Sequence, residues 1–339
     1  MTQPNRPEAL IVMDAKAFSA QFDAARLTRL GRLASLDEPV WTDDLDSADL
    51  AERLANVEVL LTGWGAPRLT AERLARMPRL TAMFHCAGTI RSLVSEEFWE
   101  RGILASNVAD ANAIPVAEFT LAAVIFAGKK APFLAADART HREDWSYLNT
   151  RGELSNLERT IGVVGFSRVG RRVVSLVQQL EGVTCLVADP YAEPGEVRAA
   201  GGTLVTLDEM LPRVDVLSLH APELPSTRHM IGAAELAALS DHATVINTAR
   251  GSLVDTAALE RECASGRLGA ILDVTEPEPL PADSVLYDLP NVMLTPHVAG
   301  SLGSEVHRMT DAALDELERY TRGVQLRAGL SHEDLRLSA

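Results

Sequence analysis

The sequence has few cysteines, and none of them is spaced as a disulfide framework or a zinc site requires. Cys86, Cys185 and Cys263 are well separated, with no C-x-x-C pair among the 339 residues. Isolated thiols of this kind are typical of reduced core cysteines in a cytosolic protein. They exclude a small disulfide-stapled fold and give no sign of a metal site.

Long hydrophobic runs and an excess of positive charge are also absent. No segment approaches the ~18 uninterrupted apolar residues of a membrane-spanning helix, and Asp14 closes the short apolar run near the start. The 32 basic residues are outnumbered by 47 acidic ones, which gives a net charge of -15. Because an acidic surface repels phosphate backbones and anionic lipid, we expect neither nucleic acid nor membrane as a partner. We expect a cytoplasmic protein.

Short apolar runs alternate with amphipathic patterns throughout the chain, without internal repeats or low-complexity segments. This alternation predicts parallel sheets built from βαβ units, and the length suffices for two domains with separate cores. The expected strands span residues 9–13, 57–63, 80–86, 103–108, 160–166, 184–190, 214–221, 243–249, 269–274 and 291–297. The main expected helices span residues 69–77, 113–142, 169–180, 255–266 and 304–321, the last with an apolar stripe that should cover the first domain.

The stretch TIGVVGFSRVG has the strand-turn-helix context of a dinucleotide-binding turn. Gly165 and Gly170 occupy the outer positions of the G-x-G-x-x-G pattern, where they permit a tight turn and close helix packing. Ser167 occupies the middle position and adds a small hydroxyl that can itself donate to a phosphate oxygen. Arg168 and Val169 offer backbone N–H groups at the helix N-terminus. We therefore interpret the stretch as a working phosphate turn.

Asp189 strengthens this interpretation, since it lies at the end of the next predicted strand, 19 residues after Gly170. A carboxylate there accepts hydrogen bonds from a ribose 2′-OH and repels a 2′-phosphate, which favours NAD over NADP. The alternative is a turn residue before Pro190. The two signals together predict NAD as the cofactor.

Three further strand ends carry residues suited to acid-base and anion chemistry. Arg250 follows the strand at 243–249, Glu278 lies in the loop after Asp273, and His297 follows the last strand. Since ligands of parallel sheets collect outside the carboxyl ends of the strands, these side chains can converge. Glu276 is an alternative to Glu278.

These residues, with the glycine turn and Asp189, closely resemble the D-isomer-specific 2-hydroxyacid dehydrogenase family. The resemblance covers almost the whole chain. It includes HAPELPSTRHMI, which is similar to the family's H-x-P-x-x-x-x-T segment, and VAE at 116–118. It implies two doubly wound, parallel-sheet α/β domains. The resemblance also implies that a Rossmann NAD-binding domain, residues 112–299, is inserted into a flavodoxin-like substrate domain, residues 1–111 and 300–339.

The resemblance implies a role for each strand-end residue. Arg250 would hold the substrate carboxylate and polarise its 2-oxo group. His297 would donate the proton in keto acid reduction and accept it in the reverse direction, with Glu278 fixing its tautomer. Asp273 would bind the nicotinamide carboxamide, and hydride would pass directly between nicotinamide C4 and substrate C2.

The other residues that the resemblance places at the cofactor are Ala221, Pro222, Thr227, Thr248, Ala249 and Gly300, together with Arg250 and His297. The histidines expected to be structural or cofactor-adjacent are His85, His220, His229 and His307.

The substrate is expected in the cleft between the domains. HCAGTI is similar to the family's glycine loop, so that Ala87, Gly88 and Thr89 would bind the substrate carboxylate. Trp64 lies where phosphoglycerate dehydrogenases carry an arginine for the substrate phosphate, and the regulatory C-terminal domain of the longer enzymes is absent from this sequence. A phosphorylated substrate is therefore not expected, with Arg91 as the alternative anion ligand.

The expected function is NAD-dependent interconversion of a D-2-hydroxy acid and its 2-keto acid. The alternatives are a phosphoglycerate dehydrogenase or a glyoxylate/hydroxypyruvate reductase. The alternative from another class is an NAD-sensing, corepressor-like binding protein, and the Arg250, Glu278 and His297 set weighs against it. The resemblance also implies a homodimer formed through the apolar segment 113–142.

Overall fold

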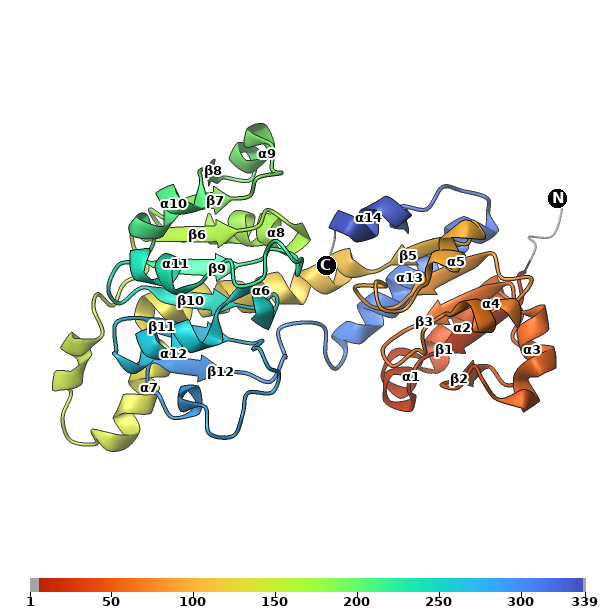
Figure 1. Ribbon diagram of the computed structural model, residues 1–339, viewed down its shortest axis with the longest axis horizontal. Coiled ribbons are helices and arrows are strands. Elements are labelled where there is room, and N and C mark those ends of the chain that lie inside the picture. The colour runs from red at the N-terminus through yellow and green to blue at the C-terminus, as the bar shows by residue number, and fades with distance from the viewer. Residues whose placement is uncertain (1–5, 338–339) are drawn as a thin grey trace. The chain divides into compact units, whose positions relative to one another are not determined.

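The computed structural model describes residues 6–337, except the side chains of 335–337, and comprises two compact units. Unit 1 contains residues 1–112 and 301–339, and unit 2 contains residues 113–300. Residues 1–5 and 338–339 of the predicted substrate domain lie outside the described residues. Each unit is built on one largely parallel sheet with helices packed against it (Figure 1), which confirms the predicted fold class of two doubly wound α/β domains.

The sheet of unit 1 has six strands in the order β13-β5-β4-β3-β1-β2. All neighbours pair in parallel except β13 and β5, and the order of β1 to β5 is flavodoxin-like. The strands are β1 (Ala9–Val12), β2 (Trp41–Thr42), β3 (Val59–Thr62), β4 (Ala82–His85), β5 (Leu104–Asn107) and β13 (Gly329–Leu330). The helices are α1 (Ala15–Gln21), α2 (Ala24–Leu33), α3 (Ala51–Asn56), α4 (Ala71–Ala75), α5 (Glu96–Glu100), α13 (Glu305–Thr321) and α14 (His332–Leu337).

The sheet of unit 2 has seven parallel strands in the order β12-β11-β10-β9-β6-β7-β8. This Rossmann order reverses between β6 and β9, the point where ligands bind in open α/β sheets. The strands are β6 (Thr160–Val164), β7 (Thr184–Ala188), β8 (Thr203–Leu204), β9 (Val216–Leu219), β10 (Thr244–Asn247), β11 (Gly269–Leu272) and β12 (Val292–Leu294). The helices are α7 (Ala131–Thr140), α8 (Arg168–Val177), α9 (Pro194–Ala199), α10 (Leu207–Met210), α11 (Ala233–Ala238) and α12 (Thr256–Ala264), and α6 (Ala109–Lys129) enters the unit from unit 1.

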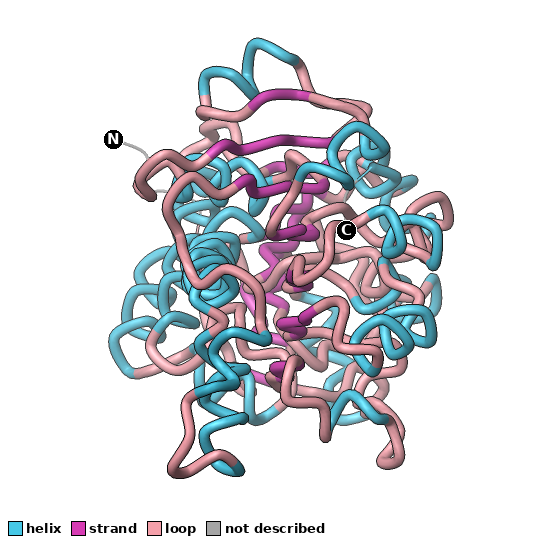
Figure 2. The backbone as a smooth tube through the Cα atoms, turned by 90° about the vertical axis from the view of Figure 1, so that its left-hand side faces the viewer, coloured by secondary structure: helices cyan, strands magenta, loops and turns pink. Residues whose placement is uncertain are grey.

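Both faces of each sheet are buried, as the alternation of strand side chains requires. In β1, Leu10 and Val12 belong to one core cluster, whereas Ala9 and Ile11 belong to another. The strands of unit 2 divide their side chains between two clusters in the same way. Figure 2 shows strands one above another with helices on both sides. The carboxyl ends of the parallel strands are thus left as the place for loops and ligands.

Helix α13 returns the chain to unit 1 and closes one of its two core clusters. Its apolar stripe, which includes Met309, Leu314 and Leu317, is buried with the strand residues of that cluster, as the sequence pattern predicted. Arg26 of α2 pairs with Asp311 of α13 at 2.6 Å. The chain then adds β13 and α14, neither of which the sequence pattern predicted.

The apolar segment predicted as one helix from Ala113 to about Arg142 is two helices in the structure. Helix α6 ends at Lys129 and α7 begins at Ala131, because Lys130 between them is left-handed with φ 51°. By length and composition α6 could cross a membrane, but half of its most apolar 18-residue stretch is buried inside the fold. Its apolar residues help to form one of the unit 2 cores.

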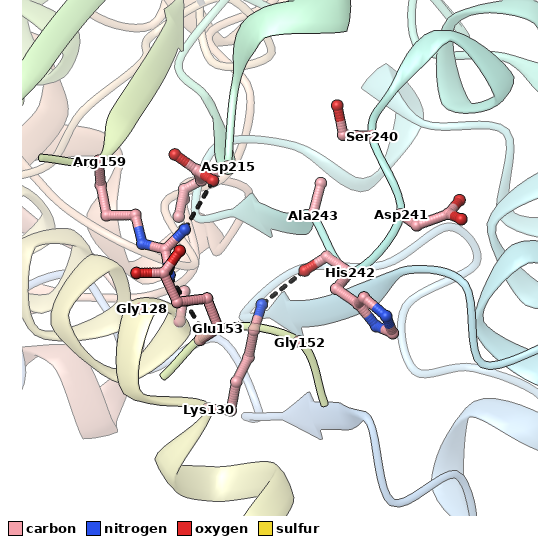
Figure 3. Close-up of a pocket in the computed structure, with 12 residues that line it drawn as sticks. Gly128, Lys130, Gly152, Glu153, Arg159, Asp215, Ser240, Asp241, His242 and Ala243 are labelled. Carbon is pink, nitrogen blue, oxygen red and sulfur yellow. Dashed lines mark hydrogen bonds and ion pairs between the residues drawn. The ribbon is translucent and has the colours of Figure 1, made fainter. Parts of the chain in front are cut away.

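Lys130 is a buried cation at the amino ends of the unit 2 strands (Figure 3). Its ammonium donates hydrogen bonds to the backbone oxygen of His242 at 2.6 Å and to Thr244 Oγ1 at 2.9 Å. Burial, and then repulsion from Arg159, lower the pKa of Lys130 to about 8, and Asp215 only partly offsets them. The neighbouring pair of Arg159 and Asp215, at 2.9 Å, ties the start of β6 to the start of β9.

This lowered pKa makes a prediction about stability. A lysine with a pKa of about 8 in the folded state and 10.5 when unfolded binds its proton more tightly in the unfolded chain, so that its charge penalises folding below pH 8. The penalty is relieved as pH rises from about 8 to about 10.5. The free energy of unfolding of the wild type, minus that of Lys130→Met, should therefore increase by roughly 2 kcal/mol between about pH 7 and about pH 10. Urea denaturation of both proteins at the two pH values measures it. Lys129→Met, at the exposed neighbouring position, is the control, and an equal increase for it would contradict the assignment.

Candidate active site

The turn after β6 is built so that the backbone of other segments approaches it closely. Gly165 has φ 94°, and a Cβ there would lie 2.6 Å from the backbone nitrogen of Ala221. A Cβ on Gly170 would lie 2.0 Å from the oxygen of Gly165. Both positions therefore require glycine. Because glycine has no side chain, neither position places atoms between the turn and a bound ligand. Such a cradle at a helix N-terminus fits a pyrophosphate.

Ser167, the departure from the glycine pattern, is the N-cap of α8. Its Oγ accepts a hydrogen bond from the backbone nitrogen of Gly170 at 3.3 Å, which satisfies one of the helix's terminal N–H groups. Its hydroxyl hydrogen is not used in that bond. Arg168 and Val169 form the first turn of α8, where N–H groups have no intrahelical acceptor. The serine thus stabilises the helix end that the motif needs.

Asp189 is fixed beside this turn by two backbone donors. The backbone nitrogen of Phe166 donates to Oδ2 at 2.7 Å, and that of Tyr191 donates to Oδ1 at 2.8 Å. A pocket of about 600 Å³ adjoins it. The pocket is lined mainly by apolar side chains, among them Val164, Ala188, Pro190, Val205 and Met230. A carboxylate at the rim of an apolar pocket suits a nucleoside, with the ribose at the acid and the base against the apolar wall.

His297 and Glu278 meet although 19 residues separate them. Nδ1 of His297 lies 2.7 Å from Oε1 of Glu278, and both side chains are about half exposed. The pairing leaves Nε2 of the imidazole available for another partner. His297 has φ 54°, a left-handed conformation that is uncommon outside glycine and requires support from its surroundings.

Asp273 provides that support. It is only 2% exposed, and its carboxylate accepts hydrogen bonds from Thr295 Oγ1 at 2.6 Å and from the backbone nitrogens of Val298 and Ala299 at 2.8 and 2.9 Å. The backbone oxygen of Asp273 accepts from the nitrogen of His297 at 2.9 Å. The residue therefore holds the loop that presents the imidazole.

Glu276, the alternative to Glu278, has other partners. Arg228 donates to its Oε1 at 2.6 Å, and Nε2 of His229 lies 3.1 Å from its Oε2. The hydrogen bond from Arg228, more than any other effect, lowers the pKa of the Glu276 carboxyl. Glu276 thus clamps the loop after β11 to the loop after β9, and Glu278 is the carboxylate that faces His297.

Arg250 follows β10 and caps the short 3₁₀ turn Gly251–Leu253. Its backbone oxygen accepts from Asn247 Nδ2 at 2.8 Å, which fixes the main chain at the strand end. The partly exposed guanidinium donates to the oxygen of Ala249 at 2.6 Å, and its Nε lies 3.9 Å from Oε2 of Glu223. It can therefore offer further N–H donors to an anion.

The other predicted cofactor residues lie at the same edge of the unit 2 sheet. Ala221 and Pro222 follow β9, and Thr227 donates to the oxygen of Pro222 at 2.6 Å. Thr248 is buried beyond β10, with its hydroxyl 2.8 Å from that of Thr120. Gly300 is the last residue of the unit.

The predicted substrate residues lie at the carboxyl edge of the unit 1 sheet. Ala87, Gly88 and Thr89 follow β4, where the oxygen of Ala87 accepts from the nitrogen of Val108 at 3.1 Å. Trp64 follows β3 and is 41% exposed. Arg91 is exposed two residues beyond Thr89, with its nitrogen donating to Thr89 Oγ1 at 3.3 Å.

Two of the remaining histidines are uncharged at neutral pH. Burial lowers the pKa of His85 to about 4 and that of His220 to about 3. His85 bonds to Thr62 Oγ1 at 2.9 Å and His220 to Ser218 Oγ at 2.8 Å. Among the described residues, no group of three His, Cys, Asp or Glu side chains could hold a metal ion.

The contact of Glu223 with Arg250 and the contacts of Glu276 with Arg228 and His229 were not predicted from the sequence. Glu223 occupies a variable position of H-x-P-x-x-x-x-T, so the motif assigns it nothing. Glu276 and Glu278 both precede a proline in the same short loop, and only the fold shows which carboxylate turns toward His297.

Comparison with known proteins finds relatives that match most of this chain. The family described as "D-isomer specific 2-hydroxyacid dehydrogenase, NAD binding domain" matches residues 123–299. The D-3-phosphoglycerate dehydrogenase of Methanocaldococcus jannaschii is 30% identical over 281 residues, 82% of this chain and 52% of that protein. The glyoxylate reductase of Korarchaeum cryptofilum is 28% identical over 84% of this chain and 86% of its own length. The crystal structure of D-lactate dehydrogenase from Aquifex aeolicus, complexed with NAD and lactic acid, is 25% identical, with a TM-score of 0.71 over 93% of this chain and 96% of that one. The chain spans about half the length of the phosphoglycerate dehydrogenases it matches.

Proposed function

The chain belongs to the D-isomer-specific 2-hydroxyacid dehydrogenase family, and on that premise we propose that it interconverts a D-2-hydroxy acid and its 2-keto acid with NAD. The observation that carries the proposal is the pair of His297 and Glu278 at 2.7 Å, on the same sheet edge as Arg250 and the phosphate turn. A pure NAD-binding protein has no need of an imidazole held in a left-handed conformation against a carboxylate. The pair therefore favours an enzyme over a corepressor-like role.

We assign the proton transfer to Nε2 of His297. With Nδ1–H donated to Glu278, Nε2 carries the exchangeable proton and gives it to the substrate oxygen during reduction of the keto acid. The Glu278 carboxylate stabilises the imidazolium before that transfer. In the oxidation direction Nε2 receives the proton from the hydroxy acid. Asp273 fixes the loop so that these positions persist.

We assign the substrate carboxylate to Arg250, whose guanidinium provides a fork of donors with fixed geometry. In unit 1, the assignment of Ala87, Gly88 and Thr89 as further carboxylate ligands and of Trp64 as a substrate contact stays a proposal. An exposed indole at position 64 favours an uncharged side chain on the keto acid over a phosphate.

The residues that would hold NAD are the turn Gly165–Gly170, Asp189 and the apolar pocket beside it. Ala221, Pro222, Thr227, Thr248, Ala249, Asp273 and Gly300 complete the proposed set. When bound, the nicotinamide supplies or accepts the hydride at substrate C2. Both carboxylate oxygens of Asp273 already accept hydrogen bonds from the loop, so any contact with the carboxamide would be an additional one.

The proposed chemistry predicts that His297→Asn lowers kcat for keto acid reduction by roughly 10²–10⁴-fold, because one acid-base group is lost. Asparagine tolerates the left-handed backbone at this position. The affinity for NADH, measured by fluorescence titration, should be unchanged. His229→Asn is the matched control, since His229 is also about half exposed, also left-handed with φ 51° and also paired with a glutamate. Equal turnover of wild type and His297→Asn would remove His297 from the mechanism.

Asp189 should set the choice of cofactor. Its carboxylate would repel a 2′-phosphate, so kcat/KM of the wild type should be at least about a hundredfold higher with NADH than with NADPH. Asp189→Asn removes the charge but keeps one oxygen for the backbone donors, and it should reduce that ratio by about tenfold or more. Glu193→Gln, an exposed carboxylate that makes no cap hydrogen bond, should leave the ratio unchanged. Efficient use of NADPH by the wild type would place Asp189 away from the ribose.

We further propose a cytoplasmic homodimer formed through the segment 113–142, with neither nucleic acid nor membrane as a partner. Exposed Phe126 of α6, at 44%, and Trp145 beyond α7, at 74%, support an apolar surface that a second copy covers. The three buried free cysteines support a reducing compartment.

Light scattering at micromolar concentration should therefore give twice the chain mass of 36.6 kDa. Phe126→Glu should shift the distribution toward the chain mass, because it places a charge on the proposed contact face. Lys129→Glu, a surface charge change at the end of the same helix, should shift the mass distribution less than Phe126→Glu does. A monomeric wild type would contradict the dimer.

A further inference from the structure

A carboxylate stands beside the arginine that is assigned to the substrate. Oε2 of Glu223 lies 3.9 Å from Nε of Arg250. Its other oxygen, Oε1, accepts a hydrogen bond from Ser252 Oγ at 2.9 Å. Ser252 is only 5% exposed, so a buried donor in the turn that follows Arg250 fixes the position of this acid.

Glu276 and Glu278, two other glutamates of this edge, have different partners. Glu276 is held by Arg228 and His229, and Glu278 faces His297. Glu223 has Arg250 as its ion-pair partner, and it makes no bidentate bond that would use up the guanidinium. The positive charge of Arg250 therefore interacts both with Glu223 and with any anion that binds to the guanidinium.

This sharing has a consequence for the charge of the substrate. Opposite charges about 4 Å apart near a protein surface interact strongly compared with thermal energy, and like charges repel as strongly. A first substrate carboxylate gains a hydrogen-bonded contact with the Arg250 guanidinium that outweighs the nearby acid. A second anionic group on the same small molecule gains no further cation from Arg250 and meets the charge of Glu223.

We propose that Glu223 is a specificity-determining residue that restricts the site to 2-keto acids with a single negative charge. The proposal rests on the proposed function, in which Arg250 binds the substrate carboxylate. It concerns a position that the family motif leaves open, and it selects by charge rather than by size. Dicarboxylic and phosphorylated keto acids are the class that Glu223 disfavours.

Two nearly isosteric probes separate charge from shape. Oxamate and oxalate both mimic a small 2-keto acid, but oxalate carries one more negative charge. Calorimetry with the full chain saturated with NADH should give a Kd for oxalate about tenfold higher than that for oxamate. Glu223→Gln keeps an oxygen for Ser252 and removes the charge, and it should lower that ratio by about tenfold. The difference between the two proteins should shrink in about 0.5 M sodium chloride, because salt screens a partly exposed charge.

Glu276→Gln is the matched control, because it removes one charge from the same edge at a carboxylate that pairs with other residues. Its Kd ratio should stay within about twofold of the wild type. An unchanged ratio of the two Kd values in Glu223→Gln, or an equal change in Glu276→Gln, would overturn the proposal about Glu223. The proposed function would still stand in that case if the enzyme reduces a keto acid. If neither probe binds and no keto acid is reduced, both proposals fall together.

Discussion

Parallel pairing of the strands of unit 2 is the constraint on which the rest of this structure depends. Parallel neighbours can be joined only by crossovers, so every strand of the sheet ends at the same edge and every crossover begins there. The turn after β6, Asp189 after β7, Arg250 after β10 and His297 after β12 are distant in sequence, and the sheet order places them on one edge. The reversal of strand order between β6 and β9 leaves room there for a ligand. The location of the site thus follows from the pairing of the strands, and the side chains then determine its chemistry.

Carboxylates then hold the strand-end loops together. Asp189 accepts from the turn after β6, and Asp273 accepts from the loop after β12. Glu276 joins the loops after β9 and β11, and Glu278 joins those after β11 and β12. Ionised carboxylates accept several hydrogen bonds and make charge-assisted ones, so short loops can be fixed without a large apolar core of their own.

The sequence predicted the long features of the fold because those features leave a periodic pattern. Every strand of four residues or more coincides with an apolar run, and α13 with its apolar stripe. The two-residue strands β2, β8 and β13 were not predicted, since two residues carry no alternation and such edge strands depend on their neighbours. The break at Lys130 was not predicted either, because a lysine in a left-handed conformation gives no local signal of the kind that glycine gives.

Within the candidate site, residue type and position predicted which side chains to examine, but not how each one is engaged. Glu276 and Glu278 are equivalent in sequence and differ only through the loops they face. Ser167 was predicted from the spacing of the glycine pattern, whereas its capping bond depends on where α8 begins. Glu223 came from no pattern at all, because it is recognised only by its neighbours Arg250 and Ser252.

The two backbone bonds of Asp189 bear on protein engineering and on the divergence of related enzymes. In the proposed function Asp189 recognises a ribose, and in the structure it also buttresses the turn. It therefore cannot be exchanged freely, since its replacement leaves the nitrogens of Phe166 and Tyr191 in need of acceptors. A lineage that shifts toward the phosphorylated dinucleotide must therefore acquire a new acceptor and a new cation in concert. A single substitution at Asp189 would remove acceptors from the turn before any cation for the phosphate is gained.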